Sequence, residues 1–181
     1  MSGPRIIAGK YRGRVLSAPA GLGTRPTNAR ARQAVFDILM HAPWAGAGFM
    51  QSARVLDVFA GTGAYGIEAL SRGAVSACFI ENDREALTAL RANIAACKAE
   101  QVTRIIKADA LHPPSGTPHD LIFLDPPYAE NLIPRALAVL SAANYFAPNA
   151  VFVAELGPQH EFAPATVLAE RRHGKARLLF W

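Results

Sequence analysis

Cysteine and paired metal-binding residues are scarce in this sequence. Only two of its 181 residues are Cys, and neither Cys78 nor Cys97 belongs to a CxxC motif or a Cys/His pattern with zinc-ligand spacing. The five histidines, at positions 41, 112, 119, 160 and 173, are scattered along the chain. We therefore expect no metal site. Both cysteines lie in apolar patterns and are expected to be buried thiols.

Uninterrupted hydrophobic runs are also missing. Every longer apolar stretch is broken by Arg, Asp, Glu or Pro, and residues 1–12 carry charge and glycine instead of the apolar core of a signal peptide. We therefore expect a cytoplasmic protein with no membrane partner. A chain of 181 residues that is 51% hydrophobic and 18% charged is long enough for one packed core. We expect one domain with a short extension, in a monomer.

Acidic residues are absent from the beginning of the chain. No Asp or Glu precedes Asp37, and the net charge of the whole chain is +5. The basic residues of this opening are Arg5, Lys10, Arg12, Arg14, Arg25, Arg30 and Arg32, and a second cluster near the C-terminus holds Arg171, Arg172, Lys175 and Arg177. Such clusters suit a polyanion such as nucleic acid. A plainly solvated basic face is the alternative interpretation.

The residue pattern divides the chain into a small extension, residues 1–26, and a larger domain, residues 27–181. The extension is rich in Gly, Pro and Arg, with brief extended segments at residues 5–9 and 14–18. The domain begins with a helix that Thr27 or Asn28 can cap and that ends near Pro43.

Strands and helices then alternate regularly. The pattern predicts strands at residues 53–59, 77–81, 103–108, 120–124 and 150–156, and helices at 64–72, 83–97 and 131–142. The strands are too continuously apolar to leave one face wet, which predicts an α/β fold with a parallel sheet covered by helices. The last two extended segments flank His173 and Gly174, a two-residue connection that predicts an antiparallel hairpin at the C-terminal end.

A glycine loop follows the first of these strands. Gly61, Gly63 and Gly66 have GxGxxG spacing, which allows positive φ angles and the close approach of a ligand between a strand and a helix, although this motif alone is weak. Asp57 stands four residues before Gly61. At the carboxyl end of its strand it would repel a phosphate and attract an amine or a sulfonium, which disfavours NAD and favours a zwitterionic ligand.

Further acids close the next two strands. Glu81 can accept both hydroxyls of a ribose, whereas Asp83 directly precedes a helical pattern and is the better candidate for a helix cap. Asp109 can accept from an adenine amine, or can simply be a loop acid. Three acids at the carboxyl ends of successive strands together predict a site for a nucleoside with a cationic tail and no phosphate.

The run LDPPY, residues 124–128, ends a buried strand with a stiff acidic corner. Pro126 and Pro127 restrict the backbone, so the Asp125 carboxylate and the Pro126 carbonyl are rigid acceptors. They can take both hydrogens of an exocyclic amine and aim its nitrogen at an electrophile, while Tyr128 stacks on the attached base. A plain turn at the end of a strand is the alternative.

The motifs together resemble a known family. AGTG after LD, with DPPY on the fourth strand, is typical of S-adenosylmethionine-dependent amino methyltransferases. Residues 5–16, 24–39, 56–74, 121–128 and 174–181 are in addition similar to the bacterial 16S ribosomal RNA (guanine-N(2))-methyltransferases of the RsmD type. The resemblance implies a Rossmann-like class I methyltransferase with a seven-stranded sheet. It also implies methylation of one guanine 2-amino group in 16S ribosomal RNA, within the small subunit or an assembly intermediate.

The resemblance also assigns roles to individual residues. Cofactor positions fall on Asp57, Phe59, Gly61, Gly63, Glu81 and Asp109, and the catalytic tetrapeptide is Asp125, Pro126, Pro127 and Tyr128. The residues expected to contact RNA are Arg5, Lys10, Arg12, Arg14, Arg25, Thr27, Arg30, Arg171 and Lys175. Departures from the family pattern are Ala29, Gln33, Tyr65 and His173, in place of Asp, Glu, Leu and Tyr. The loss of two acids makes the segment 24–33 more basic.

Other functions share some of these features. An adenine amino methyltransferase acting on DNA would use the same DPPY chemistry, but such enzymes commonly insert a large recognition region for which this chain has little room. A non-catalytic RNA-binding assembly module would keep the basic ends without needing Asp57, Glu81 and DPPY intact. An NAD oxidoreductase would depend on the glycine motif alone.

Overall fold

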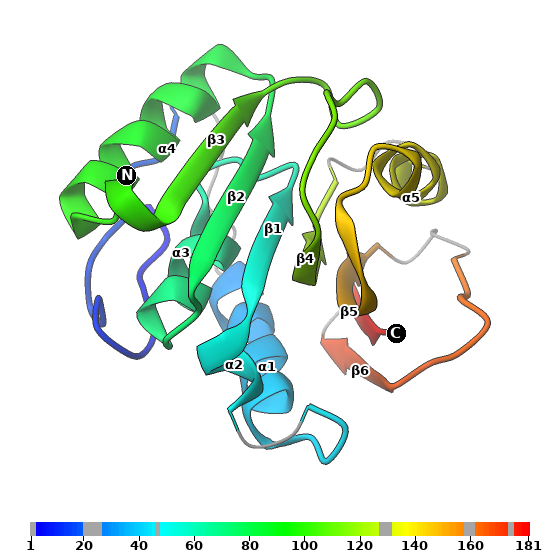
Figure 1. Ribbon diagram of the computed structural model, residues 1–181. Helices are drawn as coiled ribbons and strands as arrows, with labels where there is room; N and C mark the ends of the chain where they lie inside the picture. The colour runs from blue at the N-terminus through cyan, green and yellow to red at the C-terminus, as the bar shows by residue number, and fades with distance from the viewer. Residues whose placement is uncertain (1–2, 20–26, 46–47, 127–131, 158–161, 174–175) are drawn as a thin grey trace.

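A seven-stranded sheet forms the centre of the molecule (Figure 1). The structure is a computed structural model that describes residues 3–19, 27–45, 48–126, 132–157, 162–173 and 176–181. The strand order is β3-β2-β1-β4-β5-β7-β6. The strands are β1 Arg54–Val58, β2 Ser76–Glu81, β3 Thr103–Lys107, β4 His119–Leu124, β5 Phe146–Leu156, β6 Ala169–His173 and β7 Ala176–Phe180.

The first five strands are parallel and the last two are antiparallel, as the sequence predicts. β1 pairs with β2 and β4, β2 with β3, and β4 with β5, all in parallel, while β7 runs antiparallel to both β5 and β6. The predicted hairpin connection is wrong by one residue. His173 is still in β6 and pairs with Ala176, so the connection is residues 174–175, which lie outside the described residues. β5 also begins earlier than predicted, at Phe146.

The four predicted helices are confirmed, within one or two residues at most boundaries. They are α1 Thr27–His41, α3 Ala64–Ser71, α4 Arg84–Cys97 and α5 Leu132–Ala142. The structure adds α2 Phe49–Ser52 and a 3-10 helix, η1 Glu100–Val102. The added helices have four and three residues, so they are too short to produce a periodic pattern in the sequence. None of the helices in the described part of the chain is long and apolar enough to cross a membrane.

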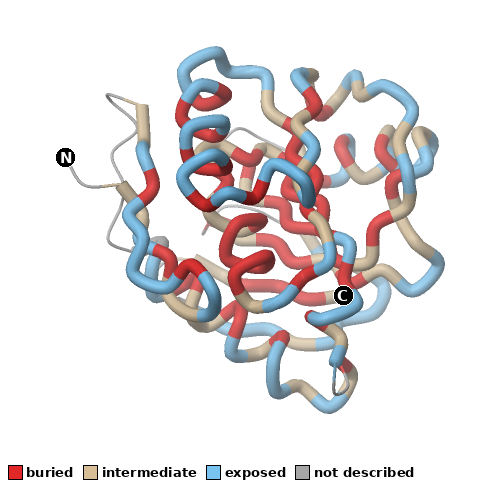
Figure 2. Tube along the Cα trace, turned by 60° about the vertical axis from the view of Figure 1, so that its left-hand side comes forward, coloured by how far each residue is buried: buried red, intermediate tan, exposed pale blue. Residues whose placement is uncertain are grey.

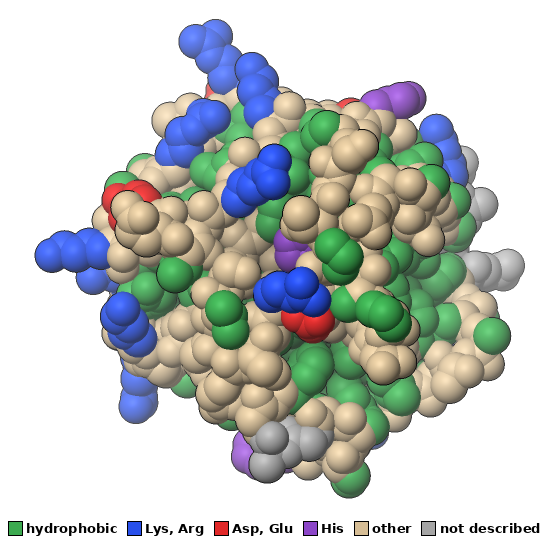
Figure 3. Space-filling model, in the orientation of Figure 1, with side chains coloured by type: hydrophobic (Ala, Val, Ile, Leu, Met, Phe, Trp, Pro, Cys, Tyr) green, Lys and Arg blue, Asp and Glu red, His purple; other side chains and the backbone are tan. Residues whose placement is uncertain are grey.

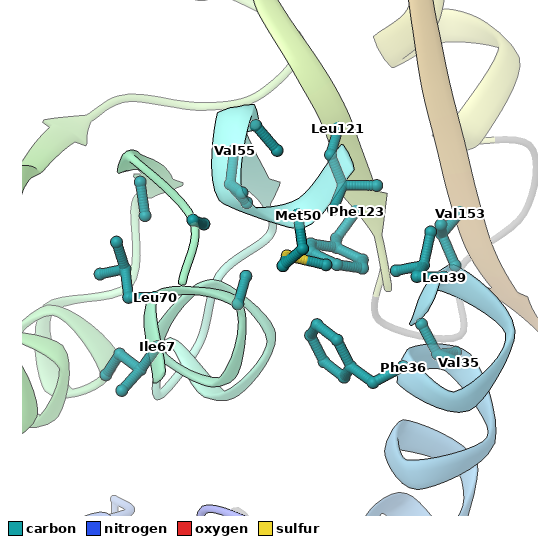
Figure 4. Packing of buried hydrophobic residues seen from close by; sticks show 14 of the residues in the cluster. Val35, Phe36, Leu39, Met50, Val55, Ile67, Leu70, Leu121, Phe123 and Val153 are labelled. Atoms are coloured by element: carbon teal, nitrogen blue, oxygen red, sulfur yellow. The ribbon is translucent and has the colours of Figure 1, made fainter. Parts of the chain in front are cut away.

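Helices cover both faces of the sheet. Side chains of α1, α2, α3 and α4 form one hydrophobic core with one face of the central strands. In Figure 4, Phe36 and Leu39 of α1 point towards Phe123 of β4 and Val153 of β5. A second core lies on the opposite face, where α5 packs through Ile133, Ala136 and Leu140. Both cysteines are buried and free, as predicted.

Part of the N-terminal extension belongs to the first core. Ile6, Tyr11 and Leu16 are buried among the side chains of that core, although their neighbours are exposed (Figure 2). The segment doubles back on itself, because the Ile6 amide donates to the Arg14 carbonyl and Arg5 forms a β-bridge with Val15. We call residues 3–19 the N-terminal segment. Its basic side chains are therefore displayed on a backbone with fixed hydrophobic anchors.

A buried carboxylate on α3 fixes the N-terminal segment. Glu68 is fully buried and accepts from the backbone amides of Ile7 at 2.8 Å and Ala8 at 3.1 Å. It also accepts from Arg72 Nε at 2.8 Å, and Arg32 Nε lies 3.9 Å from it. Charges at this depth are costly unless they are paired and hydrogen-bonded, and here the carboxylate has several donors.

Arg32 is not part of a basic surface. The sequence places it among the basic residues of the opening, but the residue is only 1% exposed, and its Nη2 donates to the Arg5 carbonyl at 2.7 Å. Its position on the buried stripe of α1, next to Ala31 and Val35, explains the difference. Burial lowers the pKa of Arg32, while the charge of Glu68 opposes this effect.

We predict that Glu68→Ala lowers the free energy of unfolding by about 3–5 kcal/mol, because it leaves buried cations and amides without an acceptor. The matched control is Arg54→Ala, which breaks the ion pair with Asp120, whose side chains are 47% and 30% exposed. An exposed pair contributes less than about 1 kcal/mol. Urea denaturation measures both values. Equal losses in the two variants would contradict the role given to Glu68.

Candidate cofactor site and active site

The glycine loop connects β1 to α3. Phe59 has φ 62° and Gly61 has φ 55°, and Gly63, with φ 78°, is the N-cap residue of α3. Phe59 is not a glycine, so its left-handed backbone is a local strain of the kind that clusters at functional sites. The loop is closed by a bond from the Gly63 amide to the Ala60 carbonyl at 2.7 Å.

Glycine is needed at Gly63 and Gly66 for one physical reason and at Gly61 for another. A Cβ atom at Gly63 would lie 2.4 Å from Leu90 Cδ1, and one at Gly66 would lie 2.4 Å from Phe79 Cε1, so both positions need glycine for close packing of α3. The space around Gly61 is open, and its nearest neighbour, the Phe59 carbonyl oxygen, is 4.0 Å away. Gly61 is therefore the position where a ligand can approach the backbone.

Asp57 lies behind the loop at the carboxyl end of β1. It is 3% exposed, and its Oδ2 accepts from the Gly66 amide at 2.9 Å. Burial raises the pKa of Asp57 to about 8, the nearby charges of Asp125 and Glu81 act in the same direction, and the bond from Gly66 opposes them. A cation bound nearby would stabilise the ionised carboxylate.

Glu81 lies at the end of β2 and holds the loop from the other side. Its Oε2 accepts from the Gly61 amide at 2.7 Å, and its Oε1 accepts from the amides of Asn82 and Asp83, both at 2.8 Å. Asp83 caps α4, because its Oδ1 accepts from the Ala86 amide at 2.8 Å, as the sequence predicts. Oε1 uses both of its lone pairs on these amides, whereas Oε2 keeps a second one, so Glu81 can accept one further bond.

Asp109 lies in the loop after β3. Its Oδ1 accepts from the Leu111 amide at 2.9 Å, and its Oδ2 is 3.1 Å from His112 Nδ1. These bonds, that from Leu111 first, lower the pKa of Asp109, so the carboxylate is ionised at neutral pH. Asp109 thus shapes its own loop and remains available as an acceptor.

One cavity of about 260 Å³ brings three of the predicted cofactor residues together, namely Phe59, Glu81 and Asp109. Its other lining residues are Ile80, Asn82, Ala108, Ala110, Leu111 and Leu132. The walls are mostly apolar and the two acids are acceptors at their edge, while none of these nine described residues is Lys or Arg. This composition fits a nucleoside without phosphate. The volume lies just below the range of roughly 300–1,000 Å³ for whole ligands, so it suits the nucleoside part of a larger molecule.

Asp57, Gly61 and Gly63 do not line this cavity but lie next to it. Leu111 and Leu132 are apolar wall residues that were not predicted as site residues from the sequence. Leu111 lies two residues after Asp109, and Leu132 lies four residues after Tyr128, so apolar residues shortly after a candidate acid or motif are the available signal.

The DPPY corner follows β4, between β1 and β5. Asp57 pairs in register with Phe123, and Leu124 pairs with Ala154, so Asp125 continues from β4 at the same carboxyl edge. Asp125 is half-buried and Pro126 is buried. Asp125 lies close enough to Asp57 for the charge of Asp125 to raise the pKa of Asp57. Pro127 and Tyr128 lie outside the described residues.

Two residues near this corner were not identified as site residues. The Tyr65 ring stacks on Phe123 with centroids 5.0 Å apart, and its hydroxyl donates to Glu155 Oε2 at 3.2 Å. Burial raises the pKa of Tyr65 well above its ordinary value, and the charges of Glu155 and Asp125 add to this. Glu155 follows the rule that identified Asp57 and Glu81, because it is an acid near the carboxyl end of a strand. The sequence analysis noted Tyr65 only as a departure from the family pattern.

The predicted RNA contacts do not form one cluster. Arg5, Lys10, Arg12 and Arg14 are exposed on the N-terminal segment, whereas Arg171 is exposed on β6, the edge strand at the other side of the sheet (Figure 1). Figure 3 shows Lys and Arg side chains projecting over the region of α4, β3 and the N-terminal segment. Arg30 is exposed on α1. Arg25, Lys175 and the Thr27 side chain belong to parts that the structure does not describe.

We predict that Asp57→Asn changes how stability depends on pH. Because the folded-state pKa of Asp57 is raised from 3.8 to about 8, the folded protein holds a proton that the unfolded chain releases, so stability falls as pH rises between these values. Urea denaturation measures the free energy of unfolding of wild type and variant at each pH. As pH rises, the difference between these free energies should change by at most about 1.4 kcal/mol per pH unit, in favour of the variant. A difference that is independent of pH from 4 to 8 would contradict the raised pKa.

Comparisons with known proteins agree with this geometry. The family described as "Conserved hypothetical protein 95" matches residues 4–181. The "Ribosomal RNA small subunit methyltransferase D" of Escherichia coli (strain K12) is 39% identical over 153 residues, which cover 83% of this chain and 73% of that protein.

Solved structures show the same fold. The "Putative methyltransferase yhhF from Escherichia coli" superimposes with a TM-score of 0.82 and 34% identity, covering 97% of this chain and 95% of that one. A more distant structure supports the fold alone. It is the Thermus thermophilus "16S rRNA N2 G1207 methyltransferase (RsmC) in complex with AdoMet and Guanosine", with a TM-score of 0.67, 17% identity, and coverage of 99% of this chain and 49% of that one.

The seven-stranded sheet with its antiparallel C-terminal end is the class I methyltransferase fold that the resemblance predicts. The family match spans almost the whole chain, and the Escherichia coli relative is well above 30% identical over most of it. The chain therefore belongs to the RsmD-type methyltransferase family, "Conserved hypothetical protein 95".

Proposed function

We propose that this protein methylates the 2-amino group of one guanine in 16S ribosomal RNA, in the small subunit or an assembly intermediate, with S-adenosylmethionine as donor. One observation carries the proposal: a cavity with acidic acceptors and no basic residue among its described lining opens at the ends of β1 and β2, and β1 pairs with β4, which Asp125 directly follows. Membership of a family that includes a ribosomal RNA methyltransferase supports the choice of RNA.

The residues around the cavity fit this donor. Glu81 would accept a ribose hydroxyl through its remaining lone pair, Asp109 would accept the adenine amine, and Phe59 with the apolar walls would hold the base. Asp57 would favour the cationic part of the ligand, because a positive charge lowers the cost of ionising this buried acid. S-adenosylmethionine supplies a methyl group activated by its sulfonium.

The acceptor would be positioned by the DPPY corner. The Asp125 carboxylate and the Pro126 carbonyl would each accept one hydrogen of the guanine amine, which localises the nitrogen lone pair and directs it at the methyl carbon. Tyr128 would stack on the base, and Pro127 would keep the turn stiff. Asp125 would also stabilise the positive charge that develops on the amine, and the proton would leave to water.

The basic residues would bind the RNA backbone. Arg12 and Arg14 are exposed, and they lie on a segment whose backbone is fixed by Glu68 and buried hydrophobic side chains. A rigid basic surface without a large recognition domain suits a substrate recognised by its folded shape.

Mass spectrometry of nucleosides from cells with and without this protein tests the proposed reaction. We expect N2-methylguanosine at one position of 16S ribosomal RNA to be lost when the protein is absent. A loss of N6-methyladenine from DNA would favour the adenine enzyme instead. Unchanged nucleosides would favour a non-catalytic assembly module.

We predict that Asp125→Ala abolishes methyl transfer, with a loss of at least about 100-fold in turnover, because the amine loses a charged acceptor in the transition state. Cofactor affinity should change little. Asp120→Ala, at the opposite end of the same strand, is the matched control and should keep its activity. Transfer of a radioactive methyl group to undermethylated small subunits measures the turnover of both variants. Full turnover of Asp125→Ala would refute the role of Asp125.

We predict that replacing Arg12 and Arg14 by Ala weakens RNA binding and flattens its dependence on salt. Each lost phosphate contact should reduce the slope of log K against log[salt] by about 1. Filter binding over a range of KCl concentrations measures the slope. Arg54→Ala, at the amino end of β1, is the control and should leave the slope unchanged, whereas an unchanged slope in the double variant would make both arginines solvated surface residues.

A further inference from the structure

Asn93 is a polar residue on the buried stripe of α4. It is 2% exposed and lies between Leu90, Ile94 and Cys97, which are all buried in the first core. A buried amide costs free energy unless its groups are hydrogen-bonded. Asn93 has three such bonds, and none of them is to its own helix.

The three bonds connect two separate parts of the site. Asn93 Oδ1 accepts from the Ser17 amide at 2.7 Å, and Nδ2 donates to the Ser17 carbonyl at 3.0 Å. The same Nδ2 donates to the Thr62 carbonyl at 2.9 Å. One side chain therefore holds both backbone groups of a residue in the N-terminal segment and one backbone group of the glycine loop.

Each of these two parts belongs to a different predicted binding surface. Thr62 stands between Gly61 and Gly63, and the Gly61 amide donates to Glu81, a wall of the cavity. Ser17 lies three residues after Arg14 and two after Val15, which forms the β-bridge with Arg5. A shift of either backbone by about 1 Å would take its bonds with Asn93 out of hydrogen-bonding range.

In the described part of the chain, the hydrogen bonds between the N-terminal segment and α3 lie away from the loop. Glu68 holds Ile7 and Ala8, and Ser71 Oγ accepts from the Tyr11 amide at 2.8 Å. Both are on α3 and bond to the N-terminal segment only at residues 7–11. Stability alone would be served by these anchors and the buried Leu16. The bridge through Asn93 adds a direct connection to Thr62.

We propose that Asn93 is a positioning residue that couples RNA binding on the N-terminal segment to cofactor binding at the glycine loop. This inference rests on the proposed function for its RNA partner. A ligand that orders one of the two backbones also orders the other through Asn93, so the second ligand meets a lower ordering cost. Coupling of this kind is reciprocal and typically changes affinities by about 5- to 150-fold.

Two variants separate coupling from simple loosening of the segment. Asn93→Ala removes the bonds that the Asn93 side chain makes to Ser17 and to Thr62. Ser71→Ala is the matched control, because it removes the Tyr11 bond of the same segment and leaves Asn93 in place. Calorimetry measures the affinity for S-adenosylhomocysteine with and without a 16S ribosomal RNA transcript. We expect RNA to tighten binding at least about 5-fold in wild type and in Ser71→Ala, and to have no effect in Asn93→Ala.

A second measurement needs no RNA. Hydrogen exchange of the amides of residues 5–17 should slow when S-adenosylhomocysteine binds to the wild type and to Ser71→Ala, but not when it binds to Asn93→Ala. Asn93→Leu, which is close to Asn in size and removes the bonds to both Ser17 and Thr62 without leaving a cavity, replaces the Ala variant if that variant does not fold. One result would contradict the proposed RNA substrate and still support the coupling between segment and loop: S-adenosylhomocysteine slows exchange in the wild type, but RNA does not change the affinity of the wild type for S-adenosylhomocysteine. Equal protection in wild type and Asn93→Ala, or no protection in wild type, would overturn the coupling.

Discussion

Two carboxylates near the ends of neighbouring strands bind backbone amides of the glycine loop and of the first turn of α3, and the rest of the site depends on this arrangement. Asp57 on β1 accepts from Gly66, and Glu81 on β2 accepts from Gly61. Because the strands are parallel and in register, both acids reach the same edge of the sheet. The loop therefore has a fixed shape before any ligand arrives, which reduces the ordering cost of binding.

The same edge gathers negative charge. Glu81, Asp57, Asp125 and Glu155 belong to β2, β1, the end of β4 and β5, which are adjacent in the sheet. Burial of Asp57, together with the nearby charges of Asp125 and Glu81, raises its pKa to about 8. Such an edge repels phosphates and favours a ligand that carries positive charge, as a sulfonium donor does. The exposed basic side chains of the N-terminal segment and of β6 do not line the cavity at this edge, so under the proposed function the donor and the RNA would contact different surfaces.

Much of the fold could be predicted from the sequence because its signals are local. Continuous apolar runs mark β1, β2 and β4, and Asp83 caps α4 through a bond to an amide three residues away. The acids that we propose as cofactor ligands are predictable for the same reason, since each lies at or close to the carboxyl end of a strand. What could not be predicted depends on contacts between residues distant in sequence. Asn93 and Ser17, which are 76 positions apart, are one example.

Buried polar residues are the hardest feature of this fold to predict from the sequence, although the sequence contains a signal for them. Arg32, Glu68 and Asn93 all lie on stripes that helical spacing marks as apolar, so a polar residue in that position indicates a buried network. Charge counting along the chain instead placed Arg32 on the surface. The cavity walls depend on where α5 begins relative to β2, which no local pattern specifies.

A crystal structure with S-adenosylhomocysteine tests the central claim most directly. The account predicts adenosine in the cavity between Phe59, Glu81 and Asp109, with the sulfur directed towards Asp125 and the loop backbone unchanged. Adenosine bound elsewhere, or a loop that has to break the bond between Gly61 and Glu81 to admit the ligand, would contradict it.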